Sequence, residues 1–374
     1  MINYQLLQII EGAGADAHRY WNLDIVEVRR LLVGAQPHEA RCQTARRIAV
    51  GAMVPHLKFE IADGPLWDLL AADYAGAYIR DRHRDHLVHS VLVFLLGIAV
   101  DEEFGQHAAG ARIRKLEWKL ASLFHDLAYP LQLASEMCSG FSDRVANLPL
   151  PNGNRLPGGA TPGLFLLPHG AYTRLAHHHS ALTFLRDRIH AWGINLDPEA
   201  SYAACLREGR IDHGLFSSLT LLHIIDRMYE HINARRVHRE CFAQYAALLS
   251  DFNEDFFDRD VLSACAAILL HTARLDGQTG LVAMPESRLA YLLRLCDTLQ
   301  EWDRPGLREP HGLDPDYFEI RLGQNGVTLI VHTPARGAHG QPGQPTHDHV
   351  QDIRETLDNN LQDRGEVEVE EVRQ

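Results

Sequence analysis

The chain has 374 residues, a formal net charge of −13 and 46% hydrophobic residues. This length and apolar content allow one large domain, or one domain with an appendage. The acidic balance argues against general nucleic-acid binding, because such proteins need clustered positive charge to neutralise phosphates. A nucleotide substrate stays open, since bound metal ions supply positive charge locally.

The six cysteines are widely scattered and form no CxxC pair. This pattern favours reduced thiols over a zinc ribbon or a disulfide framework. The first residues lack the basic stretch and long apolar run of a secretory signal, and no run reaches the roughly 18 apolar residues of a membrane span. We therefore expect a cytoplasmic protein that does not enter a membrane. The sequence leaves open whether the chain forms a homo-oligomer.

Helical patterns cover most of the first 300 residues. Residues 86–100 are almost wholly apolar, and their length favours a buried helix over a buried strand. Pro130 predicts a break or kink in the pattern that contains it. The expected helical ranges are 1–75 with breaks at Gly12–Gly14 and Gly34–Pro37, 86–100, 112–135, 171–193, 213–232, 236–250, 258–273 and 286–302.

The character of the chain changes beyond Pro305. Tyr317–Leu322 and Val327–Thr333 are β-type runs on either side of an Asn-Gly turn, which predicts a hairpin. A helix near 347–362 and a last strand at 366–372 should follow. The sequence therefore predicts a mainly α fold with a small C-terminal α+β appendage.

Three segments are expected on this basis. They are an N-terminal helical extension at 1–80, a helical domain at 81–308 and the α+β tail at 309–374. Within the second segment, residues 139–170 are rich in glycine and proline. Irregular insertions of this length are often functional, so we expect a lid or specificity loop there.

The residues that indicate chemistry begin with His125-Asp126, inside the apolar stretch LASLFHDLAYP. A buried carboxylate is costly unless it is paired or binds a metal. Adjacent side chains on a helix point about 100° apart, so both can reach one metal only near a helix end or kink. His86 and His89 share a helical face, and Asp297 lies in another apolar helix.

Together, the segments HSVLVFLLG, LFHDLAYP and LLRLCDTLQEW resemble the HD superfamily of metal-dependent phosphohydrolases. The resemblance covers residues 82–305 and implies a helical bundle with a divalent metal. It also implies a second metal, with Asp126 bridging the two and with His125 and Asp126 at the catalytic centre. The metal ligands it implies are His89, His125, Asp126, His213, His271 and Asp297.

The substrate is less well defined than the metal site. The Gly-Tyr-Pro motif of the cyclic-dinucleotide branch is missing, and Leu127–Pro130 stands where a lysine often follows the His-Asp pair. Imidazole and carboxylate ligands suit Mn, Fe, Zn, Co or Ni, and such a metal activates water for attack on a phosphate. We therefore expect a nucleotide or related small phosphate ester as substrate. The residues expected to contact it are Tyr129, His179, Gln300 and Arg304.

Two other functions fit the same residues. An HD-type di-iron oxygenase needs the same ligand types, and it would retain iron and depend on oxygen. A non-catalytic sensor would bind a nucleotide without turnover. His86 has two possible roles: it contributes to the site, or it only caps or solvates the basic segment before it.

Overall fold

The computed structural model describes twelve stretches of the chain: residues 1–53, 86–107, 113–136, 173–175, 180–209, 211–236, 256–273, 287–303, 313–323, 326–335, 341–360 and 367–373. Within them the chain is mostly helical with one three-stranded sheet, which confirms the predicted mainly α class. The predicted insertion at 139–170 and nearly all of the helix predicted at 236–250 lie outside the described residues.

Four helices form the N-terminal part of the chain. They break at the two predicted places, because Gly14 adopts a left-handed backbone conformation and an extended stretch follows Val33. The third helix has a strong N-cap, since the Asp24 carboxylate accepts the backbone N–H groups of Val26 and Glu27. The helices are α1 (Ile2–Gly12), α2 (Gly14–Trp21), α3 (Ile25–Val33) and α4 (His38–Met53).

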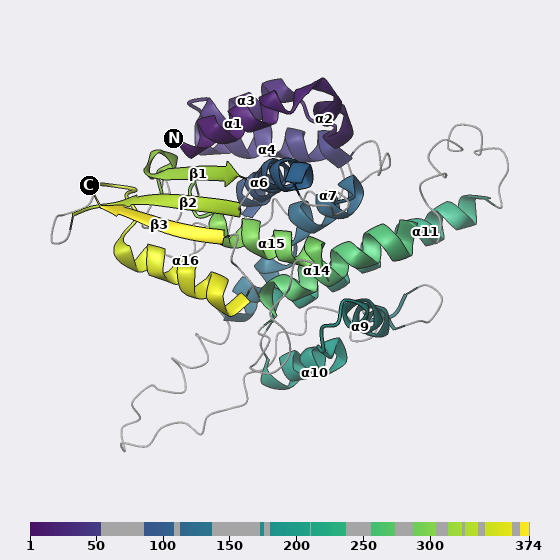
Figure 1. The fold of residues 1–374 in the computed structure, drawn as a ribbon. Coiled ribbons are helices and arrows are strands. Elements are labelled where there is room, and N and C mark those ends of the chain that lie inside the picture. The colour runs from purple at the N-terminus through teal and green to yellow at the C-terminus, as the bar shows by residue number, and fades with distance from the viewer. Residues whose placement is uncertain are drawn as a thin grey trace, which may run out of the picture.

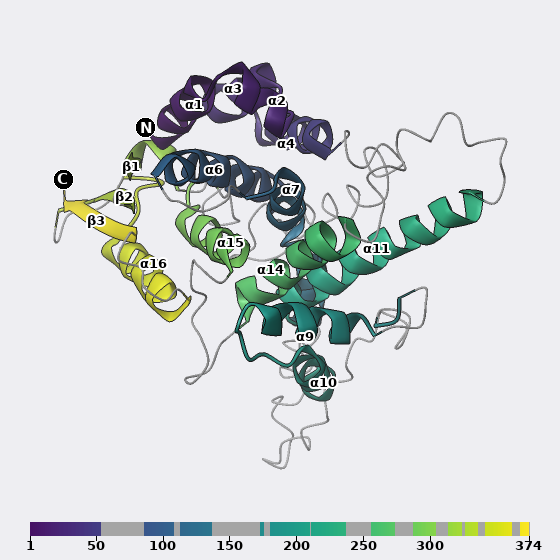
Figure 2. The same cartoon turned by 45° about the vertical axis from the view of Figure 1, so that its right-hand side comes forward.

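The central helices pack around two that are buried along the described part of their length. These two are α6 (His86–His107) and α14 (Leu262–Thr272), and their almost continuous apolar sequence explains their burial. Around them lie α7 (Lys115–Phe124), α15 (Arg288–Leu299) and the first turns of α11 (His213–Arg236), which then projects away from the body (Figures 1 and 2). The remaining elements are α9 (Ala181–Ala191), α10 (Pro198–Glu208) and the π-helical turn η3 (Phe257–Val261).

The C-terminal part forms the sheet in the order β1-β2-β3, which confirms the predicted hairpin, helix and last strand (Figure 1). β1 and β2 are antiparallel, with Phe318 opposite Val331. β2 and β3 are parallel, with Val327 opposite Val367, and α16 supplies the crossover that a parallel pair requires. The elements are η4 (Pro315–Tyr317), β1 (Phe318–Gly323), β2 (Gly326–Thr333), α16 (His347–Asn360) and β3 (Val367–Arg373).

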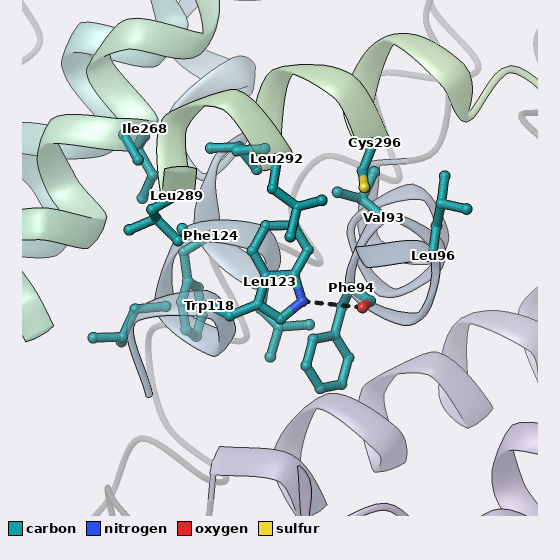
Figure 3. Packing of buried hydrophobic residues seen from close by; sticks show 14 of the residues in the cluster. Val93, Phe94, Leu96, Trp118, Leu123, Phe124, Ile268, Leu289, Leu292 and Cys296 are labelled. Atoms are coloured by element: carbon teal, nitrogen blue, oxygen red, sulfur yellow. Dashed lines mark hydrogen bonds between the residues drawn. The ribbon is translucent and has the colours of Figure 1, made fainter. Parts of the chain in front are cut away.

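One hydrophobic cluster runs from α1 through the central helices to α16. Polar contacts also join the N-terminal helices to the segment after α15, because the Asp303 carboxylate accepts Asn3 Nδ2 at 2.8 Å and Arg41 Nη2 at 3.0 Å. At the centre, the buried Trp118 indole donates to the Phe94 carbonyl and packs against α6 (Figure 3). None of the helices within the described ranges has the length and hydropathy that a membrane span requires.

Candidate metal centre

The six residues expected to bind metal come from five separate segments, and the structure brings them together where α6, α7, α11, α14 and α15 meet. His89 lies on α6, and His125 and Asp126 directly follow α7. His213 begins α11, His271 lies in the last turn of α14, and Asp297 lies near the end of α15.

The His-Asp pair is positioned by the end of a helix. α7 ends at Phe124, residues 125–128 form a turn, and a new helix covers 129–136. Pro130 lies in the first turn of that new helix, where its missing N–H costs nothing. Ser217 of α11 holds the turn, since its Oγ accepts the Ala128 N–H at 2.8 Å. The predicted break is therefore confirmed, but the turn comes before Pro130.

His213 reaches the site because α11 approaches α14 closely. A Cβ atom on Gly214 would lie 2.2 Å from Thr272 Oγ1 and 2.9 Å from the Ile268 carbonyl oxygen, so only glycine fits here. Asp212 completes this contact. Its Oδ1 accepts the Leu215 N–H at 2.9 Å and so caps the N-terminus of α11, and it also accepts the Thr272 hydroxyl at 2.7 Å.

The buried Asp126 carboxylate stands between two sets of imidazoles. Its Oδ1 lies 3.3 Å from Nε2 of His213 and 3.6 Å from Nε2 of His271. Its Oδ2 lies 3.5 Å from Nε2 of His125 and 3.8 Å from Nε2 of His89. We call these the Oδ1 side and the Oδ2 side of Asp126. One carboxylate thus presents a different oxygen to each set.

Asp297 completes the Oδ2 side. Its Oδ1 lies 2.9 Å from His89 Nε2 and 3.6 Å from His125 Nε2. Two ligand atoms that are each about 2.1 Å from one metal lie about 2.9–3.4 Å apart at octahedral or tetrahedral angles. The observed separations are close to this range. Two His/Asp groups here could hold a metal ion: His89, His125 and Asp297, and His125, Asp126 and His271.

The four imidazoles share one hydrogen-bonding arrangement. In each, Nδ1 faces an oxygen that can only accept, so Nδ1 carries the proton and donates it. In a neutral ring, Nε2 is then left with a free lone pair that faces the carboxylates. The pairs are His89 with Gln300 Oε1, His125 with the Ser122 carbonyl, His213 with Gln132 Oε1 and His271 with the Ile268 carbonyl.

His271 gives the clearest indication that a cation fits this site. Its Nε2 is buried and has no hydrogen-bond partner among the described residues. Burial lowers the pKa of His271, which disfavours a proton on this atom. A lone pair therefore faces the Asp126 oxygen 3.6 Å away, and two electron-rich atoms in that position need a cation between them. Imidazole nitrogen and carboxylate oxygen are ordinary ligands of divalent transition metals.

The pKa values show how the remaining charges are balanced. Burial alone would lower the pKa of His125, but the carboxylates of Asp126 and Asp297 raise it to about 9, so at neutral pH its Nε2 carries a proton that a bound metal ion would have to displace. Burial alone would raise the pKa of Asp126, but His125 and His86 hold it well below its usual range. The pKa of Asp297 is depressed in the same way by His125 and His89. Both carboxylates are therefore ionised at neutral pH, as metal ligands must be.

Of the four residues expected to bind substrate, the structure describes two, and these two lie on different sides of the metal centre. Tyr129 is half-buried at the edge of the site, with its ring 3.9 Å from that of His86 and 5.1 Å from that of His213. Gln300 lies fully buried behind His89, on the Nδ1 side of the ring. His179 and Arg304 lie outside the described residues. His86 itself contributes to the site, with Nε2 3.7 Å from Asp126 Oδ2.

Two contributors were missed by the sequence reasoning. Gln132 binds His213, and Ser217 fixes the turn after Asp126. Neither could be found from the helical pattern, because each has an ordinary place on its helix and gains its role only by contact with another helix.

Comparisons of the chain with protein-family models, with curated proteins and with solved structures gave no match.

Proposed function

We propose that the chain is a cytoplasmic, metal-dependent phosphohydrolase with an HD-type helical bundle, acting on a nucleotide or a related small phosphate ester. One or two divalent transition metals (Mn, Fe, Zn, Co or Ni) would be held by His89, His125, Asp126 and Asp297 on the Oδ2 side and by His213, His271 and Asp126 on the Oδ1 side. The observation that carries this proposal is the set of four imidazoles whose Nε2 atoms face two carboxylates, the buried Asp126 and the partly exposed Asp297, while each Nδ1 is bound to an acceptor.

Each side chain of the site would have its own role. Asp126 faces His125 with Oδ2 and His213 with Oδ1, so its carboxylate sets the distance between the two groups of imidazoles. Burial of Asp126 and His125 keeps bulk water away and strengthens their electrostatic interactions. A bound divalent metal supplies what these side chains lack, because it lowers the pKa of a water molecule towards neutrality and offsets phosphate charge.

Substrate would enter from the less buried side of the cluster. The side chain of Asp297 is 27% exposed and that of His213 is 19% exposed, whereas His89 and His125 are fully enclosed. Tyr129 lies at the same partly open edge, next to His213. A phosphate group arriving there would meet both sides of Asp126, and the Tyr129 ring would flank the rest of the molecule.

The test is phosphate release from a panel of nucleotides and phosphate esters with added Mn²⁺. The wild-type chain should release phosphate from at least one substrate, and Asp126→Ala should reduce release to background. Asp187→Ala should keep full activity, since Asp187 is an exposed carboxylate on α9. Equal release by wild type and Asp126→Ala would contradict the role given to Asp126.

Failure of the whole panel would contradict the phosphohydrolase proposal. Retained iron together with substrate-dependent oxygen consumption would then assign the oxygenase function. Nucleotide binding without turnover would assign the sensor function. The two outcomes are separated by metal analysis and oxygen consumption on the same preparation.

A further inference from the structure

We propose that Gln132 and Gln300 are positioning residues that set the metal affinity of the Oδ1 side and the Oδ2 side of Asp126 separately. This inference rests on the proposed metal centre. Outer partners of metal-binding histidines fix the tautomer and orientation of the ring, and their loss typically weakens metal binding 10–100-fold. In this chain, two glutamines from separate helical segments occupy that position.

Gln300 acts on the Oδ2 side. Its Oε1 accepts a hydrogen bond from His89 Nδ1–H, and its Nε2 donates to the Trp302 carbonyl. The second bond fixes which end of the amide is oxygen, because a carbonyl cannot bind the oxygen end. Gln300 is fully buried, so bulk solvent does not reach these atoms. The His89 lone pair is therefore directed at Asp297.

Gln132 acts on the Oδ1 side with the same logic. Its Oε1 accepts His213 Nδ1 at 2.7 Å and the His213 backbone N–H at 3.1 Å. Its Nε2 donates to Glu136 Oε1 at 2.8 Å, which again fixes the amide orientation. One oxygen thus holds both the ring and the first backbone amide of α11. The His213 lone pair is directed at Asp126 Oδ1.

The other two imidazoles do not need such help. His125 and His271 each donate to the backbone carbonyl three residues earlier, Ser122 and Ile268 respectively. Their orientation is set within their own helical segment. Each side of Asp126 therefore combines one locally fixed imidazole with one that depends on a glutamine from elsewhere. This pairing predicts that the two glutamines act on different metal positions.

The experiment is a calorimetric titration of the metal-free full chain with Mn²⁺. We expect two binding events in wild type. Gln132→Leu should weaken one of them 10–100-fold, and Gln300→Leu should weaken the other by a similar factor. Gln351→Leu is the matched control, because Gln351 donates to Glu355 at 3.0 Å in the same i,i+4 arrangement on the exposed face of α16. Its Mn²⁺ affinities should equal those of wild type.

Double variants separate positioning from a general structural effect. In a His213→Ala background, Gln132→Leu should cost little further Mn²⁺ affinity, because the ring it positions is gone and only its bond to the backbone N–H of residue 213 is left to lose. The same substitution should keep its full effect in a His89→Ala background. Gln300→Leu should keep its full effect on Mn²⁺ affinity in the His213→Ala background and lose it in the His89→Ala background. An equal loss in both backgrounds would overturn the proposal.

A charge-neutral exchange provides the rescue. Gln132→Glu combined with Glu136→Gln keeps an acceptor for His213 and a donor to satisfy it, with the same total charge. This pair should restore Mn²⁺ affinity to within about threefold of wild type, well inside the loss expected for a missing outer partner. The proposal would be overturned if this double variant bound Mn²⁺ as weakly as Gln132→Leu does. If wild type binds no Mn²⁺, the proposed metal centre itself is wrong. If wild type binds Mn²⁺ and both glutamine variants bind it equally well, the metal centre stands and this inference alone is wrong.

Discussion

Two helix crossings in this chain depend on a glycine, and they serve different purposes. At the crossing of α6 and α7, a Cβ atom on Gly97 would lie 1.9 Å from the Trp118 ring. At the crossing of α11 and α14, a Cβ atom on Gly214 would lie 2.2 Å from Thr272 Oγ1. The first crossing encloses an indole among apolar side chains, as Figure 3 shows. The second brings the His213 ring to 5.1 Å from that of His271.

The difference teaches how close packing can serve either stability or a site. The indole gains from dispersion and burial, and its one polar atom is satisfied by the Phe94 carbonyl. The imidazoles instead bring nitrogen atoms next to a buried carboxylate, which costs free energy until a cation is bound. Changes at the first crossing should therefore affect folding, and changes at the second should affect metal binding as well.

Gly97→Ala should have the largest effect on stability. The added carbon overlaps a fully buried ring that cannot move without losing its hydrogen bond, so we expect the free energy of unfolding to fall by about 3 kcal/mol. Urea unfolding of the metal-free chain measures it. Gly51→Ala in α4 is the control, because no atom lies within 4 Å of its added carbon. That variant should gain up to about 1 kcal/mol from helix propensity. Equal stability of the two would contradict the packing assigned to Trp118.

Asp126→Asn should have the largest effect on metal binding. Loss of the charge shared by both sides of the site should weaken Mn²⁺ binding roughly 100-fold, which is about 2.7 kcal/mol. Asp101→Asn is the control, since Asp101 is an equally buried carboxylate that pairs with Arg288 at 2.8 Å. It should lower stability without changing metal content. Full metal occupancy in Asp126→Asn would defeat the assignment of this residue.

Gly214→Ala should change both properties, each to a smaller degree. The added carbon pushes α11 away from α14, so we expect a loss of about 2 kcal/mol in stability. His213 should move with α11, and binding at the Oδ1 side should weaken about tenfold, in the range of other losses of ligand orientation. Calorimetry with Mn²⁺ and urea unfolding together check both effects. A loss of stability with unchanged Mn²⁺ affinity would show that the crossing does not position His213.

Lys119→Met should act on a separate property, the slope of stability against pH. Lys119 is fully buried on α7, donates to the Ala52 carbonyl, and burial lowers its pKa to about 7. Between pH 7 and about 10.5 the unfolded chain keeps the proton that the folded chain has lost, so this group makes stability rise with pH. Lys119→Met should flatten that rise by at most about 1.4 kcal/mol per pH unit.

The control for this measurement is Lys115→Met, which removes the same charge one helical turn earlier. Lys115 is half-buried over the Tyr20 ring. Its variant should keep nearly the whole slope in urea unfolding from pH 7 to 9. An identical slope in wild type and Lys119→Met would contradict the shifted pKa of Lys119.

Much of the helical structure was determined by the sequence itself. Apolar periodicity, Gly12–Gly14 and the Asp212 N-cap set the helices and their ends through contacts within a few residues. The hairpin of β1 and β2 was also predictable, because its turn and strands are adjacent in the chain. The candidate ligands came instead from the resemblance of three short apolar segments to the HD superfamily, and each of those segments can be read without knowing the tertiary structure.

Only the tertiary structure decided how these ligands are arranged. Which Asp126 oxygen faces which imidazole depends on how five segments pack, and no periodicity encodes that. Gln300 was expected to contact substrate, but the structure places it behind His89, and Gln132 carried no signal at all. The approach of α11 to α14 likewise depends on a glycine whose role appears only when Thr272 lies opposite. Local patterns determine what a helix buries, whereas contacts between helices determine what the buried groups can bind.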